Sequence, residues 1–279
     1  MIKFILSAVL TFTASLCLGQ QKATPKITLS KSNTVALHGP VTYSSVAQLQ
    51  QKLVALSNNL SKNSTIYLYL NTPGGSVGAG MALIDTIKSL PQEVVTVTSF
   101  AASMGFITVQ SLGRRVILPN ATLMSHRARG GVSGQIPGEM TTRSAWIHKT
   151  IEDIERDMAK RMKMSLSAYQ KLILNEYWVV GQHAIKDNAA DVIANVVCDS
   201  SLEGTQVETI YTFFGAVKLT MSKCPLVSAP LAFDFEDTNL WMLEPKERLK
   251  AENAIKMPYL KKREFVEQHS KNGNVGVYL

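Results

Sequence analysis

The stretch that decides the fold reads STIYLYLNTPGGSVGAGMALIDTIKSL and spans residues 64–90. Apolar side chains alternate from Ile66 to Leu70, which predicts a strand. The Pro-Gly-Gly triplet at 73–75 predicts a tight turn, and the apolar residues between Met81 and Ile87 recur with helical spacing. The unit is therefore a strand, a glycine turn and a helix.

The same unit recurs further along the chain. A strand-like run from Glu93 to Thr98 precedes a turn of small residues at 101–105, an apolar helix at 106–112 and a further strand at 115–118. Strands that alternate with helices favour an α/β fold with parallel pairing. The turns that follow neighbouring parallel strands lie side by side, where α/β proteins usually place their sites.

A lone serine lies in the second of these turns. Ser103 stands where a helix is expected to begin, beside free backbone N–H groups and the positive end of the helix dipole. Gly74 and Gly75 lack a Cβ, so their N–H groups can approach a reacting carbonyl closely. These features fit a nucleophilic serine with an oxyanion hole. They fit equally a serine that caps the helix beside an ordinary glycine loop.

Several sequence blocks together resemble the ClpP family of serine peptidases. YLYLNTPGGSVGAGMALIDTI, AASMG and LPNATLMSH occur in the family's order and close to its spacing, and VALHGPV at 35–41 is similar to its first strand. GGVSGQ at 130–135 resembles the start of the family's handle region. The resemblance covers residues 33–195. It implies a ClpP/crotonase-like core of repeated ββα units arranged as a superhelix, with a long handle helix over 138–164. In the family this helix packs two rings face to face, which implies a ring-like homo-oligomer.

The resemblance also implies roles for single residues. Ser103 matches the nucleophile and His126 the general base, and a serine hydroxyl needs such an imidazole to take its proton. The expected oxyanion hole consists of the N–H groups of Gly74 and Met104. The residues expected to bind substrate are Gly75, Ser76 and Arg129.

The third member of the triad departs from the family pattern. The family has an aspartate just before an aromatic residue, and alignment of Trp178 with that aromatic places Glu176 at the aspartate position. A glutamate can still orient the imidazole and stabilise its charged form. Alternatives are Asn175, Asp187 and Asp191. A second departure is Arg127-Ala128-Arg129, where the family tends to have Gln-Pro, and this change concerns specificity more than chemistry.

Residues 1–19 read as a secretory signal peptide. Lys3 precedes an apolar run from Phe4 to Leu18 that is short for a membrane span. The alternative of a lipid anchor at Cys17 is disfavoured by the bulky Leu16 before it. We therefore expect an exported protein, periplasmic or extracellular, in which a linker over 20–32 leads into the peptidase domain.

Residues 196–279 are expected to form a small appended subdomain whose role the sequence does not reveal. Cys198 and Cys224 are the two cysteines left after signal removal, and an oxidising compartment favours a disulfide between them over two buried thiols. The net charge of +8 is concentrated in residues 246–263. A solvated helix face is the favoured interpretation of these charges. If they do bind a partner, the absence of a nucleic-acid motif makes an anionic envelope surface more natural than nucleic acid.

Three functions remain open from the sequence. The first is a ClpP-like serine endopeptidase that acts on peptides or unfolded proteins, with no cofactor or metal. Export removes it from an ATP supply, so ATP-independent activity without an unfoldase partner is expected. The second is a catalytically silent crotonase-superfamily module for assembly or binding, which the missing aspartate supports. The third is a Ser-Lys enzyme like the signal peptide peptidases. The ordered AASMG and MSH blocks favour a Ser-His enzyme over this third function.

Overall fold

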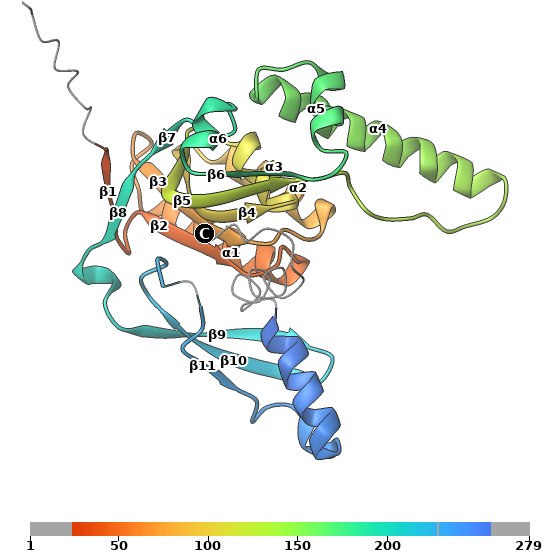
Figure 1. Cartoon of the computed structure of the whole chain (residues 1–279). Helices are drawn as coiled ribbons and strands as arrows, with labels where there is room; N and C mark the ends of the chain where they lie inside the picture. The colour runs from red at the N-terminus through yellow and green to blue at the C-terminus, as the bar shows by residue number, and fades with distance from the viewer. Residues whose placement is uncertain (1–23, 228, 258–279) are drawn as a thin grey trace, which may run out of the picture.

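The computed structural model describes residues 24–227 and 229–257. Its main sheet has six strands, β2 to β7 (Figure 1). The strands are β2(Thr34–His38), β3(Thr65–Thr72), β4(Glu93–Ala102), β5(Arg115–Ser125), β6(Tyr177–Val180) and β7(Val192–Ile193). The neighbours β2, β3, β4 and β5 pair in parallel, and β6 runs antiparallel to β5. The short β7 pairs in parallel with β5. The predicted α/β class and parallel pairing are confirmed.

Three helices connect the parallel strands and cover one face of the sheet: α1(Tyr43–Asn58), α2(Val77–Ser89) and α3(Met104–Ser111). Thr42 begins α1 with a capping box to Ser45. Alternate residues of β3 enter two apolar clusters, with Leu68 and Leu70 facing the helices and Tyr69 on the opposite side. Both faces of the sheet are therefore buried, as a parallel sheet requires.

The predicted turn over 101–105 is shorter than expected. β4 continues through Ala101 and Ala102, which are both buried, and α3 begins at Met104. Ser103 alone connects the strand to the helix. The sequence pattern missed this because two small alanines fit a buried strand as well as a turn.

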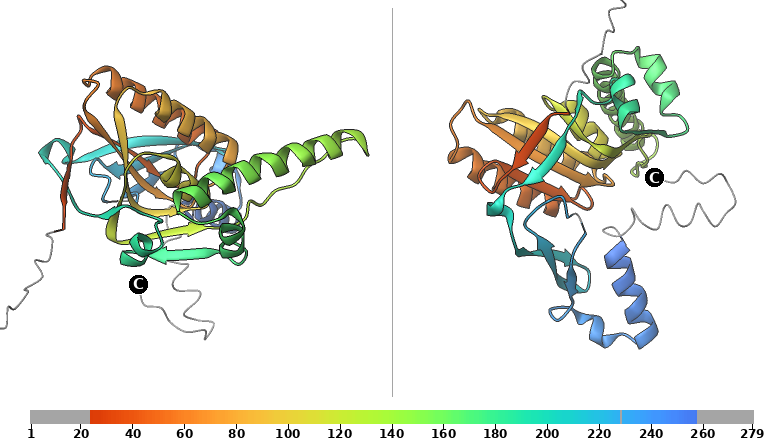
Figure 2. Two further views of the ribbon diagram at one scale, coloured as in Figure 1. Left: turned by 90° about the horizontal axis from the view of Figure 1, so that it is seen from above. Right: turned by 60° about the vertical axis from the view of Figure 1, so that its left-hand side comes forward.

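A long helical arm projects from the body of the protein (Figures 1 and 2). It consists of α4(Gly138–Arg161), followed by α5(Leu166–Leu172). Only the end of α4 near Met158 and Ala159 is buried, whereas Trp146 is 66% exposed. This helix confirms the long helix predicted over 138–164, which ends at Arg161. The short helix α6(Gln182–Lys186) follows β6.

The opposite face of the sheet carries the start of the described chain and the segment that follows β7. β1(Lys26–Leu29) and β8(Asn195–Cys198) pair in parallel, and Leu29 packs with Tyr69 and Val97 in the second apolar cluster. The stretch over 20–32, expected as a linker, thus contains a strand.

The C-terminal subdomain is a three-stranded antiparallel sheet with a short core of Val217, Leu219 and Met221. Its first strand lies against α1, where Lys52 forms an ion pair with Glu208. Residues 245–257 are helical, and within them Glu252 pairs with Arg248 and Lys256. The remaining elements are η1(Ser200–Leu202), β9(Thr205–Thr212), β10(Gly215–Ser222), β11(Ala232–Asp234) and η2(Asn239–Met242).

Several predictions concern residues outside the described ranges. These are the signal peptide over 1–19, the alternative lipid site at Cys17 and the basic residues 258–263. None of the helices in residues 24–227 and 229–257 combines the length and apolar character that spanning a bilayer requires.

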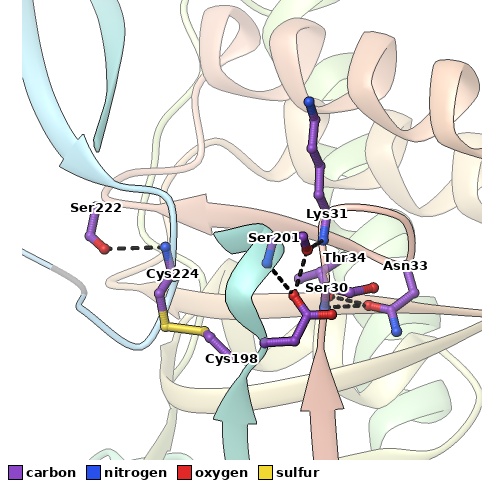
Figure 3. Close-up of a disulfide and its surroundings, with 9 residues drawn as sticks. Ser30, Lys31, Asn33, Thr34, Cys198, Ser201, Ser222 and Cys224 are labelled. Atoms are coloured by element: carbon purple, nitrogen blue, oxygen red, sulfur yellow. Dashed lines mark hydrogen bonds between the residues drawn. A yellow bond between two sulfur atoms is a disulfide. The ribbon is translucent and has the colours of Figure 1, made fainter. Parts of the chain in front are cut away.

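A disulfide between Cys198 and Cys224 fastens the C-terminal sheet to the main body, and it confirms the predicted pairing (Figure 3). Cys198 ends β8, while the Cys224 N–H donates to Ser222 Oγ just after β10. Beside the disulfide, the Lys31 N–H donates to Ser201 Oγ, which ties the start of the chain to the same region. The sequence separation of 26 residues makes the bond a restraint on the unfolded chain.

Replacing both cysteines by serine is expected to lower the free energy of unfolding by about 3.5 kcal/mol, because the unfolded chain regains the entropy of a closed loop of this size. Urea denaturation of the purified protein, with wild type under reducing conditions as the control, measures the difference. Free-thiol titration of the unreduced, denatured protein should find no thiol at these positions. Two titratable thiols would contradict the bond.

Candidate active site

Ser103 occupies a strained turn between β4 and α3. Its backbone has φ 56° and ψ −119°, a region that residues other than glycine rarely adopt. The Ser103 N–H donates to Met124 O on the neighbouring strand at 2.9 Å, which holds this conformation. The side chain makes no capping hydrogen bond to α3, so the helix-cap alternative is wrong. Strained backbone that the surroundings hold in place is common at active sites.

The Ser103 hydroxyl contacts an imidazole instead. Ser103 Oγ lies 2.8 Å from His126 Nε2. Ser103 follows β4 and His126 follows β5, and the pairing of Ala102 with Met124 brings the two strand ends together. The distance and atoms are those that let an imidazole accept a serine proton.

The glycine turn after β3 packs directly on Ser103. A Cβ on Gly74 would come within 2.4 Å of Ala102 O and 2.7 Å of Ser103 Cβ, and a Cβ on Gly75 would meet Val41 O at 2.3 Å. Both glycines have positive φ, at +86° and +151°. Only glycine therefore allows this close approach of two turns.

The structure corrects the predicted oxyanion pair. The Gly74 N–H donates to Thr72 Oγ1 at 3.1 Å and is therefore engaged within its own turn. Within residues 24–227 and 229–257, the Gly75 N–H has no hydrogen-bond acceptor. Met104 opens α3, where the first N–H groups have no intrahelical acceptor. Gly75 and Met104 thus offer the free donors next to Ser103.

The expected third triad member lies opposite His126 but points elsewhere. β5 and β6 pair with Ser125 opposite Tyr177, so one step further the antiparallel register sets His126 opposite Glu176. Glu176 has φ 67°, which ends the strand. Its Oε1 lies 3.1 Å from Arg129 Nη2, and its Oε2 accepts a hydrogen bond from Trp178 Nε1 at 3.0 Å.

His126 Nδ1 is buried without a hydrogen-bond partner among the described residues. The expectation that Glu176 orients the imidazole is therefore not met in this conformation. The reason is local, because the positive φ of Glu176 and its ion pair with Arg129 direct the carboxylate away from His126. The ion pair that holds it is weak, since the Arg129 side chain is 77% exposed and surface pairs contribute about 0–1 kcal/mol.

The fallback acids are engaged in structural contacts. Asp187 accepts a hydrogen bond from the Tyr177 hydroxyl at 2.8 Å. Asp191 pairs with the buried guanidinium of Arg115 and with Arg161. Asn175 is exposed. None of the three contacts His126.

Of the residues expected to bind substrate, Gly75 and Arg129 border the serine turn and the histidine loop. Ser76 has a structural role, because its hydroxyl accepts from the Ala79 N–H and begins α2. Among residues 24–227 and 229–257, no three His, Cys, Asp or Glu side chains are grouped to hold a metal ion.

A narrow cavity of about 50 Å³ opens beside the Ser103–His126 pair. Sequence reasoning missed its polar members, which are Ser125, Tyr169 and Glu155. The Tyr169 hydroxyl is hydrogen-bonded to Ser125 Oγ at 2.7 Å, and burial raises the pKa of Tyr169 to about 12. A signal was present, since Glu155 falls on the apolar face of α4 four residues after Ile151.

The comparisons with known proteins agree with this geometry. The family model described as Clp protease matches residues 19–196. The chain is 32% identical over 169 residues to the ATP-dependent Clp protease proteolytic subunit of Streptococcus sanguinis (strain SK36), a match that covers 59% of this chain and 86% of the relative. The protein of the same name from Streptococcus pyogenes serotype M5 (strain Manfredo) is 31% identical over the same coverage. With the serine, histidine and glycine turns of the site all inside the matched region, the chain belongs to the Clp protease family, a family of serine peptidases.

Proposed function

We propose that this chain is a serine endopeptidase that cleaves peptide bonds through an acyl-enzyme on Ser103. The 2.8 Å contact between Ser103 Oγ and His126 Nε2 carries the proposal. His126 takes the hydroxyl proton as Oγ attacks the scissile carbonyl, and then gives that proton to the leaving amine. A water molecule, deprotonated by the same imidazole, hydrolyses the ester and restores the serine.

The free N–H groups of Gly75 and Met104 would stabilise the oxyanion that forms during each attack. Both belong to turns that are fixed before substrate arrives, so their dipoles need no reorganisation in the transition state. The position at the start of α3 adds the positive end of the helix dipole.

Glu176 is the proposed third member of the triad. Its place opposite His126 and its weak surface ion pair support a rotation of the carboxylate from Arg129 to His126 Nδ1. Such a contact would satisfy the buried Nδ1–H and stabilise the imidazolium.

We also propose a compartment and an oligomeric state for this protein. The signal-like residues 1–19 and the disulfide support export. The relatives are named ATP-dependent, whereas an exported enzyme lacks ATP, so we propose ATP-independent hydrolysis of peptides or unfolded proteins. The projecting α4 with its exposed Trp146 supports a homo-oligomer. An anionic envelope surface as partner of residues 246–263 stays a prediction.

A silent assembly module is the second candidate, and the unpartnered His126 Nδ1 favours it. A Ser-Lys enzyme gains no support, because no lysine of the described chain lines the cavity beside Ser103.

The first test is hydrolysis of fluorogenic peptides and of an unfolded protein in the absence of ATP. Ser103→Ala and His126→Ala should each lower kcat/KM by roughly 10⁴–10⁶-fold, because removing one triad member leaves only residual catalysis. His183→Ala, an exposed histidine, is the matched control and should keep full activity. No activity in wild type under any condition would favour the silent module.

The second test addresses the triad. Glu176→Gln should lower kcat by roughly 10²–10⁴-fold without unfolding, because an amide stabilises the imidazolium poorly. Arg129→Gln should keep or raise kcat, since it frees the Glu176 carboxylate. Asn175→Asp serves as the companion variant, and a rate gain there would move the triad position to residue 175. Unchanged activity in Glu176→Gln would leave a Ser-His dyad.

The third test addresses export. The full chain, expressed with its leader in a bacterial host, should be recovered outside the cytoplasm and begin near Gln20 when its N-terminus is sequenced. Recovery in the cytoplasm with Met1 intact would remove export from the proposal, and with it the argument for ATP-independence.

A further inference from the structure

The cavity beside Ser103 has apolar walls and one acidic group. Seven aliphatic or sulfur-containing side chains line it, together with the Ser103–His126 pair and the hydrogen-bonded Tyr169 and Ser125. Glu155 is the one carboxylate that the described residues contribute to the lining. The apolar wall consists of Val77, Ile107, Ala128, Ile151, Ile154, Met158 and Ile173.

Glu155 faces the cavity because of its place on α4. Ile151, Glu155 and Met158 stand at i, i+4 and i+7, so they share one face of the helix. Glu152, three residues earlier, does not line the cavity and instead forms an exposed ion pair with Arg156. Of these two carboxylates, only that of Glu155 is available to the cavity.

The Glu155 carboxylate is fixed but not neutralised. Its Oε2 accepts a hydrogen bond from Gln170 Nε2 at 2.8 Å, and its Oε1 has no hydrogen-bond donor among the described residues. No lysine or arginine of the described chain lines the cavity. A half-buried carboxylate between apolar walls is stabilised more by a cationic partner than by a neutral one, because charge-assisted hydrogen bonds are about twice as strong as neutral hydrogen bonds.

We propose that Glu155 makes this cavity a specificity pocket for a lysine or arginine side chain on the acyl side of the scissile bond. The inference rests on the proposed peptidase activity, since it is Ser103 that positions the scissile carbonyl at the mouth. The aliphatic stem of such a residue would lie along the isoleucine and methionine wall while its cationic end reaches Glu155. The cavity is small, at about 50 Å³.

The test compares three peptides that differ only at this position, with lysine, norleucine or glutamate before the fluorophore. Wild type should cleave the lysine peptide with kcat/KM roughly 10–100-fold above the norleucine peptide, and the glutamate peptide least. Glu155→Gln keeps an oxygen acceptor for Gln170 and should bring the lysine-to-norleucine ratio close to one. Glu152→Gln, on the same helix, should leave the ratio as in wild type.

Two results would overturn the pocket while leaving the peptidase intact. One is cleavage of lysine and norleucine peptides at equal rates by wild type. The other is a preference for lysine that Glu155→Gln retains. Labelling by a fluorophosphonate separates these two results from failure of the peptidase activity itself. A protein that is not labelled and cleaves none of the three peptides lacks the proposed function, and the pocket assignment is then wrong as well.

Discussion

The backbone strain at Ser103 is the constraint on which the rest of the site depends. A serine with φ 56° is unfavourable by itself and persists only because its surroundings leave no alternative. Its N–H is held by Met124 O, and Gly74 packs against its Cβ. A Cβ at Gly105 would meet Thr72 Cγ2 at 2.6 Å, so the helix after the serine lies equally close to β3. Three strands of one parallel sheet thus fix a single hydroxyl within reach of His126.

Much of this arrangement could be predicted from the sequence, because it follows from local patterns. Apolar alternation from Ile66 to Leu70 predicts a strand, and the paired glycines and the small residues around Ser103 predict turns after two strands. Parallel pairing of those strands brings both turns to the same edge of the sheet. The disulfide was predictable because Cys198 and Cys224 are the only two cysteines after residue 19.

The rest depended on side-chain competition in three dimensions. Glu176 was expected on His126, and the register does set it there, yet its positive φ and Arg129 turn the carboxylate away. Gly74 was expected as an oxyanion donor, but its N–H donates to Thr72 Oγ1, and the N–H without an acceptor among the described residues is that of Gly75. The strand β1 escaped notice because its partner β8 lies far along the chain.

The central claim is that Ser103 is an activated nucleophile in the folded protein. The most direct measurement is to treat the folded protein with diisopropyl fluorophosphate, digest it, and locate the adduct by mass spectrometry. The account predicts one adduct, on Ser103, that is absent when the protein is unfolded in urea before treatment, because activation requires His126 at hydrogen-bond distance. A folded protein that gains no adduct, or that gains it on another serine such as Ser125 at a comparable rate, would contradict the account.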